Sequence, residues 1–218
     1  MAYDLIIFDM DGTLVDSEPL SNRIFHEKLL LHGLDPRLDL ATVTHDLTGL
    51  SLPSCFALIR ERYGLSLPGD FEYDLQAETY RRLKTDLQPI PGVPAMLSQI
   101  PQAKCVASSS EPEKIALSLE LCALHHHFTP HLFSARQVAN GKPAPDLFLF
   151  AAERMGGTPP SACAVIEDSL PGATAGIRAG MTVFAYRPEP ADPQAAAFRD
   201  LGCRVFADMA DLPRLLAA

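Results

Sequence analysis

The sequence lacks a long apolar stretch, and it lacks an excess of basic residues. No segment approaches the roughly 20 consecutive apolar residues that a membrane-spanning helix needs. The 218 residues include 18 Lys and Arg against 27 Asp and Glu, which gives a formal net charge of -9. Binding to nucleic acid or to an anionic membrane surface requires a basic face, and no basic run is present. The sequence therefore argues against a protein that binds nucleic acid or membranes.

The cysteines also lack the spacing of a metal or redox motif. There are five, an odd number, and no two of them form a C-x-x-C pair. We interpret them as reduced and mostly buried thiols. The apolar run at 5–8 is too short for the core of a secretion signal, and it ends in an aspartate. Both observations favour a cytoplasmic location.

What the sequence does contain is an alternation of short apolar runs and helical patterns. A first strand is predicted at 5–8. Apolar positions at helical spacing follow from 17 to about 86, with no good strand among them. Strands and helices then alternate, which is typical of a parallel sheet wrapped by helices. We predict an α/β fold, with a Rossmann-like core at 1–16 and 87–218 and a helical insert at 17–86; a single domain with long helices is the alternative.

The individual elements can be placed from the same pattern. In the insert, helices are expected at 17–32, 53–63 and 71–84. In the core, we expect strands at 104–107, 131–133, 162–166 and 182–185, helices at 111–123, 145–156 and 170–179, and a last strand–helix unit at 203–217. Ligands of an open α/β sheet bind beyond the carboxyl ends of its strands. The residues that follow each predicted strand are therefore the candidate site residues.

Two aspartates follow the first predicted strand, in the sequence LIIFDMDGT. Asp9 and Asp11 are separated by one residue, so a loop could direct both carboxylates toward one point. Gly12 permits a tight backbone path at this place. Carboxylates held close together repel each other, so a fold tolerates them when a cation lies between them or when one takes part in chemistry.

Hydroxyl groups follow the strand predicted to end at residue 107, in the sequence SSSEPEK. Ser110 and Glu113 fit a helix capping box. The hydroxyls and the free N–H groups at such a helix start could also bind an anion. Taken alone, however, these serines are more typical of a cap.

A lysine and two more carboxylates complete the set. Lys142 lies in the loop ANGKPAPD just before a predicted helix, although a lone lysine is more often a surface residue. Glu167 and Asp168 leave the strand predicted to end at 166, although a helix cap by Asp168 or Ser169 is a common alternative. Several carboxylates suit Mg²⁺, which also binds phosphate oxygens. One aspartate could attack phosphorus while its neighbour handles the proton.

The chain contains four motifs in this order: D-x-D-G-T, a serine after an apolar strand, G-K-P-x-P-D and E-D-S-x-x-G. Together they resemble the motifs of the haloacid dehalogenase (HAD) superfamily. More narrowly, the chain resembles the phosphatase and β-phosphoglucomutase-like members with a helical cap, and the resemblance covers essentially its whole length. It implies a core domain at 1–16 and 87–218 and a cap domain at 17–86. It also implies that Asp9 is the nucleophile that becomes an aspartyl-phosphate. Asp11 would protonate the leaving oxygen and then activate water.

The same resemblance implies a role for the other site residues. Lys142 would bridge Asp9 and the phosphate. Asp168 would bind Mg²⁺ with Glu167 beside it, together with Asp9 and the backbone carbonyl of Asp11. Phosphate binding is expected at Ser108, the N–H of Ser109, Lys142 and the loop at Gly12.

Departures from related subfamilies narrow the expected activity. A dehalogenase of this superfamily lacks a carboxylate at the place of Asp11, which argues against dehalogenation. β-Phosphoglucomutase carries a histidine and an arginine in its cap where this sequence has Ser21 and Leu52. We therefore predict a Mg²⁺-dependent phosphatase that acts on a small phosphorylated metabolite such as a sugar phosphate, with no obligate protein partner implied. A hexose-phosphate mutase, a phosphorylatable signalling domain and a catalytically silent binding protein are the alternatives.

Overall fold

The computed structural model describes residues 3–47, 50, 52–189 and 192–217. The chain divides into two compact units. Met1–Asp16 and Gln88–Ala218 form the first, called the core unit here, and Ser17–Leu87 forms the second, called the helical unit. That these units are a core domain and a cap domain stays a prediction.

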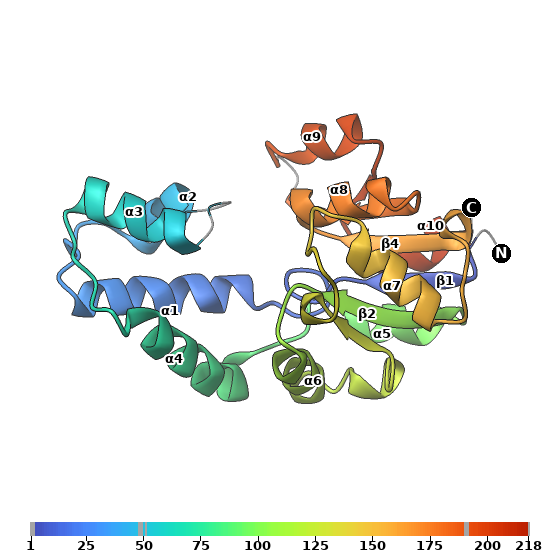
Figure 1. Cartoon of the computed structure of the whole chain (residues 1–218), viewed down its shortest axis with the longest axis horizontal. Coiled ribbons are helices and arrows are strands. Elements are labelled where there is room, and N and C mark those ends of the chain that lie inside the picture. Colours follow the sequence, from blue (N-terminus) through green and yellow to red (C-terminus); the bar gives the residue numbers. More distant parts are fainter. Residues whose placement is uncertain (1–2, 48–49, 51, 190–191, 218) are drawn as a thin grey trace. The chain divides into compact units, whose positions relative to one another are not determined.

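A six-stranded sheet forms the centre of the core unit (Figure 1). Every neighbouring pair of strands is parallel, and the spatial order is β3-β2-β1-β4-β5-β6. The strands are β1 (Leu5–Phe8), β2 (Ala103–Ser108), β3 (Leu132–Ser134), β4 (Cys163–Glu167), β5 (Thr182–Tyr186) and β6 (Arg204–Phe206). This is the strand order of a Rossmann-like, doubly wound sheet, so the predicted α/β fold class is confirmed.

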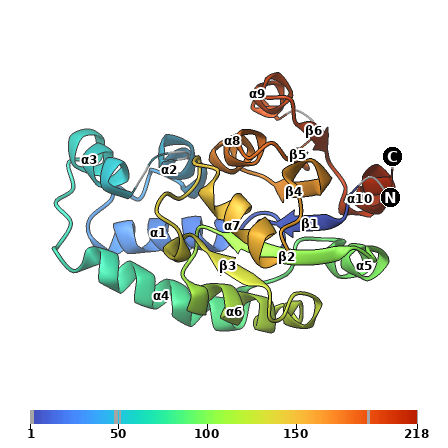
Figure 2. The same ribbon diagram turned by 45° about the vertical axis from the view of Figure 1, so that its right-hand side comes forward.

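The strands are short apolar runs because the sheet is buried on both faces. Ile7 of β1 belongs to one buried cluster with residues of α7 (Asp146–Arg154) and α8 (Leu170–Arg178). Phe8, the next residue, points to the opposite face because side chains alternate along a strand. There its ring packs edge-on against Phe128, with 5.8 Å between the ring centroids. Figure 2 shows α7 and α8 beside the strands that they cover.

The remaining helices of the core unit are short. They are α5 (Val93–Gln99), α6 (Pro112–Leu121), α9 (Ala195–Asp200) and α10 (Leu212–Ala217), with 3₁₀ turns at His125–His127, Ala135–Gln137, Pro160–Ala162 and Met209–Asp211. The capping box predicted from Ser110 and Glu113 is wrong. Glu111 is the N-cap of α6, and it makes no side-chain capping bond. The physical reason is that the hydroxyl of Ser110 donates to Asp11 instead, across 99 residues of sequence.

The chain path fixes where a site can form. From β1 the strand order runs outward through β2 and β3 on one side and through β4, β5 and β6 on the other. The order therefore reverses between β1 and β4. Loops diverge at such a reversal and leave a crevice at the carboxyl ends of the strands. Asp9 follows β1, and Glu167 ends β4, so both lie at this reversal.

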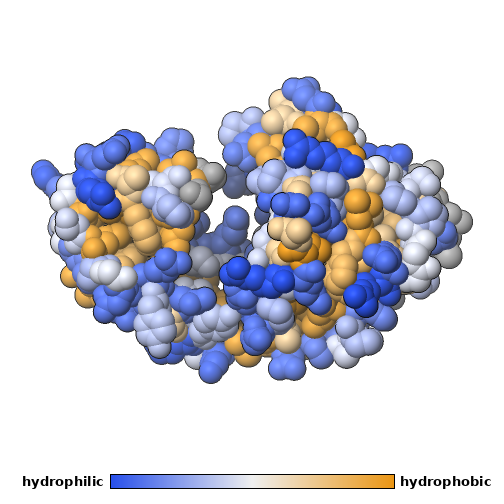
Figure 3. All heavy atoms as spheres, viewed as in Figure 1, coloured by the Kyte–Doolittle hydropathy of each residue, from blue (hydrophilic) through white to orange (hydrophobic). Residues whose placement is uncertain are grey.

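The helical unit has a hydrophobic core of its own. It consists of α1 (Glu18–Leu31), α2 (Leu40–Leu47), α3 (Leu52–Tyr63) and α4 (Phe71–Asp86), with α1 packed against α4. Phe71 is 1% exposed, and its ring contacts those of Phe25, His32 and Phe56. In Figure 3, hydrophobic residues also show on the surface of this unit over α2 and α3. Among the helices in the described part of the chain, none is both long and apolar enough to cross a membrane.

Candidate active site

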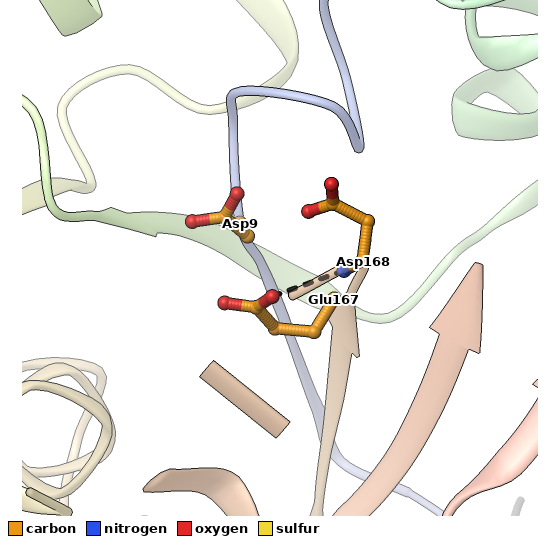
Figure 4. A group of neighbouring side chains, drawn as sticks. All are labelled: Asp9, Glu167 and Asp168. Carbon is orange, nitrogen blue, oxygen red and sulfur yellow. Dashed lines mark hydrogen bonds between the residues drawn. The ribbon is translucent and has the colours of Figure 1, made fainter. Parts of the chain in front are cut away.

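Three carboxylates meet where β1 and β4 end. These strands pair with Phe8 opposite Ile166, and the N–H of Asp9 donates to the carbonyl of Ile166 at 2.9 Å. This pairing brings the side chains that follow each strand together (Figure 4). One carboxylate oxygen from each of Asp9, Glu167 and Asp168 lies within 4.8 Å of the other two.

Lys142 joins two of these carboxylates. Its Nζ lies 2.5 Å from Oδ1 of Asp9 and 2.7 Å from Oε1 of Glu167. The lysine side chain is only 4% exposed, and its ammonium group lies 4.9 Å from the centre of the Phe148 ring. A surface lysine would keep its ammonium group in water. Lys142 is therefore a buried charge, which the carboxylates at its tip compensate.

Both oxygens of Glu167 are engaged. Oε1 accepts from Lys142, and Oε2 accepts from the N–H of Asp168 at 3.0 Å, from the N–H of Ser169 at 2.9 Å and from the hydroxyl of Ser169 at 2.8 Å. Ser169 also caps α8, because its hydroxyl accepts from the N–H of Gly172 at 3.1 Å. Gly172 leaves room for Glu167, since a Cβ there would lie 1.6 Å from Oε1. Glu167 thus holds both Lys142 and the start of α8.

Asp168 accepts hydrogen bonds from two other parts of the core unit. The hydroxyl of Thr13 donates to its Oδ1 at 3.2 Å, and Arg187 donates to its backbone carbonyl at 2.7 Å. Gly12 has φ of +77°, and a Cβ at this position would lie 2.2 Å from Oδ2 of Asp168. Only glycine meets both conditions without strain. The tight path predicted at Gly12 is therefore present, and it lets the loop after β1 approach the Asp168 carboxylate.

Burial changes the protonation of these groups. Burial, together with the negative charges of Glu167 and Asp11, raises the pKa of Asp9 to about 7, although Lys142 opposes the shift. Burial opposes the charged form of Lys142, but Asp9 and Glu167 outweigh it and raise the pKa of the ammonium group well above its usual range. The site therefore holds a fixed positive charge next to a carboxylate that is costly to ionise without a further cation.

The donor set fits a divalent metal ion. Three carboxylates lie together, and one ammonium group balances only one of them. Hard cations such as Mg²⁺ take carboxylate oxygens and waters as ligands. Each of Asp9, Glu167 and Asp168 offers one oxygen to this group, and both oxygens of Glu167 also accept hydrogen bonds. The metal-binding roles expected for Asp9, Asp11, Glu167 and Asp168 stay predictions.

The structure places the other predicted site residues on the neighbouring loops. Ser108 is the last residue of β2 and is 2% exposed, and its hydroxyl accepts from the N–H of Ser110 at 3.1 Å. Ser109 is exposed. The carboxylate of Asp11 is not a member of the Asp9–Glu167–Asp168 group, because it accepts from Ser110 and from Lys114. The expected roles of Ser108, Ser109 and the Asp11 carbonyl stay predictions.

Sequence reasoning missed two residues that contact the site. Lys114 donates to both oxygens of Asp11, at 2.9 and 3.0 Å. Arg187 binds the carbonyl of Asp168, forms an ion pair with Asp192 and stacks on Phe198. Lys114 belongs to the SSSEPEK stretch that the sequence does single out, and Arg187 directly follows β5. The rule that selects residues after strand ends could have found Arg187, whereas Lys114 lies one turn into a helix.

Comparison with known proteins gives a consistent result. Residues 3–180 match the family model described as haloacid dehalogenase-like hydrolase. The chain is 31% identical over 216 residues to 6-phosphogluconate phosphatase of Escherichia coli, covering 99% of this chain and 95% of that protein. It is 33% identical over 198 residues to hexitol phosphatase A of the same organism, covering 85% and 83%.

A solved structure extends this likeness to three dimensions. The HAD family hydrolase from Deinococcus radiodurans, whose crystal structure holds phosphate and sodium, superposes with a TM-score of 0.85 at 30% identity. The match covers 99% of this chain and 96% of that one. The chain therefore belongs to the haloacid dehalogenase-like hydrolase family, which confirms the family and the enzyme class predicted from its motifs.

Proposed function

We propose that the protein is a Mg²⁺-dependent phosphatase that hydrolyses a small phosphorylated metabolite of the sugar-phosphate type through an aspartyl-phosphate on Asp9. The contact of 2.5 Å between Lys142 and Asp9 carries this proposal. It places a buried positive charge beside the carboxylate that would attack phosphorus. Positive charge fixed at that point stabilises the transferring phosphoryl group.

The arrangement of the core unit supports a separate role for each of the site residues. Asp9 would attack phosphorus, and Lys142 would neutralise the phosphoryl oxygens while Glu167 keeps the lysine in place. Ser108, buried at the end of β2, would donate to a phosphoryl oxygen. Asp9 and Asp168 would hold Mg²⁺, which supplies charge neutralisation when bound. Asp11 would give a proton to the leaving oxygen and later take one from the attacking water.

The relatives support the substrate class. Those named above act, by their names, on 6-phosphogluconate and on hexitol phosphates, which are phosphates of small sugar derivatives. The choice among such compounds would depend on side chains outside the shared motifs. A cytoplasmic location stays part of the same proposal.

The test is release of inorganic phosphate from a panel of sugar and polyol phosphates. We expect release with Mg²⁺, none with a chelator, and a loss of at least about 1,000-fold in Asp9→Asn. A matched control is Asp200→Asn, an exposed aspartate at the end of α9, which should keep wild-type rates. If Asp9→Asn kept its activity, the aspartyl-phosphate route would be wrong. If no phosphate appeared but a hexose 1-phosphate became its 6-phosphate, the mutase alternative would hold instead.

A further inference from the structure

The carboxylate of Asp11 receives an unusual number of donors from one short segment. Nζ of Lys114 lies 2.9 Å from Oδ1 and 3.0 Å from Oδ2, and the hydroxyl of Ser110 donates to Oδ2 at 2.7 Å. Lys114 also donates to the Ser110 hydroxyl at 3.1 Å. Both oxygens of the carboxylate therefore accept hydrogen bonds, which restricts rotation of the carboxylate about the Cβ–Cγ bond of Asp11.

The two donors are themselves well anchored. The carbonyl of Ser110 accepts from the hydroxyl of Ser134 at 2.6 Å, and its N–H donates to Ser108 at 3.1 Å. Lys114 is on the first turns of α6, which the buried side chain of Ile115 fixes against the core unit. The side chains of Lys114 and Asp11 are 22% and 25% exposed, so their ion pair is partly shielded from water.

We propose that Lys114 is a positioning residue that acts through Asp11 and aims its carboxylate at the leaving oxygen of the substrate. This inference rests on the proposed phosphatase function. A partly exposed ion pair contributes little to folding stability, so stability gives no sufficient account of the arrangement. Proton transfer, in contrast, depends steeply on the placement of the acid, and a small misplacement of a catalytic group lowers the rate strongly.

The step that Lys114 would serve can be written in full. A carboxylate oxygen of Asp9 forms a bond to phosphorus while the bond from phosphorus to the leaving oxygen breaks. The proton on Asp11 passes to that oxygen, which departs as an alcohol. Water then attacks the phosphorus and gives a proton to Asp11, and the bond between phosphorus and Asp9 breaks to release inorganic phosphate. Lys114 takes no part in bond making and only holds the group that carries the proton.

A pair of substrates with different leaving groups tests the role. A sugar phosphate releases an alkoxide that needs protonation, whereas p-nitrophenyl phosphate releases a stable phenolate that does not. We expect Lys114→Met to lower both kcat and kcat/KM about 30-fold or more on the best sugar phosphate of the panel, since general acid catalysis is worth 100-fold and above. On p-nitrophenyl phosphate the kcat/KM of the same variant should stay within about threefold of the wild type, because kcat/KM reports the steps up to departure of the phenolate, and those steps need no proton.

Conservative and control variants sharpen the result. Lys114→Arg should recover most of the kcat on the sugar phosphate, because a guanidinium group can bind both oxygens of a carboxylate. Ser110→Ala removes the hydrogen bond from the Ser110 hydroxyl to Asp11 and should give a smaller loss of the same kind. Lys104→Met is the matched control: this lysine lies near the amino end of β2, away from the carboxyl ends of the strands, and the variant should behave as wild type.

Three outcomes would overturn the proposal, and they can be told apart. Equal losses of kcat/KM on both substrates would show that Lys114 does not act through the proton that Asp11 gives to the leaving oxygen. A raised KM with unchanged kcat would show that it binds the substrate itself. A wild type that hydrolyses neither compound would remove the proposed function and the role of Lys114 with it. Circular dichroism and thermal unfolding of each variant establish that a loss of activity is not a loss of fold.

Discussion

At the scale of one residue, Asp9 shows that a site residue can lower the stability of the fold. Its carboxylate is 7% exposed, and burial with two nearby negative charges raises its pKa to about 7. Without a metal ion, the folded protein binds a proton there between about pH 4 and pH 7 that the unfolded chain has released. The free energy of unfolding of the metal-free protein should therefore fall as the pH rises through this range.

The first prediction follows from that sign. Between pH 5 and pH 7.5, metal-free wild type should lose about 2 kcal/mol of unfolding free energy relative to Asp9→Asn, because about 1.4 kcal/mol corresponds to one pKa unit. Urea unfolding in the presence of a chelator, at several pH values, measures the difference. Parallel pH profiles for the two proteins would show that Asp9 titrates as an ordinary aspartate.

A second prediction concerns the metal ion itself and needs no substrate. Mg²⁺ should stabilise the wild type by about 2.7 kcal/mol at 100 times its Kd, which raises Tm by about 5 °C or more. Asp168→Asn removes a carboxylate from the Asp9–Glu167–Asp168 group and should abolish most of this shift. Asp200→Asn, exposed on α9, is the control and should keep it. A full shift in Asp168→Asn would place the ion elsewhere.

Most residues of this kind are visible in the sequence because they lie at the end of a strand, and Lys142 is visible because it lies in a loop with glycine and proline just before a helix. Asp9 and Glu167 could be predicted because the carboxyl ends of neighbouring parallel strands meet at one edge. Lys114 could not be predicted, because it reaches Asp11 over 103 positions from inside a helix. The sequence also does not show that one oxygen of Glu167 accepts from Lys142 and the other from the start of α8, since these contacts depend on the directions of side chains.

At the scale of one element, Gly172, the third residue of α8, serves the site rather than the helix. An alanine in place of a helical glycine normally stabilises a helix by about 1 kcal/mol. At Gly172, however, the added Cβ would meet Oε1 of Glu167 at 1.6 Å. The carboxylate would have to move and release Lys142.

We therefore predict the opposite sign for Gly172→Ala. Disrupting a buried ion pair costs about 3 kcal/mol or more, so the variant should unfold at lower urea concentration and lose activity. Gly69→Ala is the matched control. Gly69 is exposed just before α4, and a Cβ there has no neighbour within 4 Å, so this change should be neutral or slightly stabilising. Equal stabilities for the two variants would mean that Glu167 can shift at little cost.

Elements with strong hydrophobic patterns could be predicted, and those that depend on distant partners could not. The strand predicted at 5–8 is β1 itself, because its four residues are buried on both faces. Helix α2 had no separate prediction within the insert, since only Val43 and Leu47 of its eight residues are buried. The prediction of a capping box at Ser110 was wrong because the local sequence pattern contains no information about Asp11. The hydroxyl that would cap the helix donates to the Asp11 carboxylate instead.

At the scale of the whole molecule, the cysteines show how completely the interior is packed. All five are free and buried, as predicted, and they come from both units: Cys55 lies in the helical unit, and Cys105, Cys122, Cys163 and Cys203 lie in the core unit. Burial raises the pKa of Cys122, Cys163 and Cys203 to about 11 and that of Cys105 well above its usual range. The reactive form of a cysteine is the thiolate, so burial and a raised pKa protect these groups together.

The last prediction concerns the five buried thiols. They should react slowly in the folded protein, and the free energy of unfolding should fall at alkaline pH. At pH 8, a thiol reagent such as dithionitrobenzoate should react slowly with native protein, while five thiols react at once in urea. The unfolded chain releases its thiol protons at about pH 8.5, well before the folded protein does. The free energy of unfolding should therefore fall as the pH rises from about 8 toward 11, because the unfolded state alone gains from ionisation there. Rapid labelling of native protein would show instead that one of the units opens readily, and the position of the labelled cysteine would identify which one.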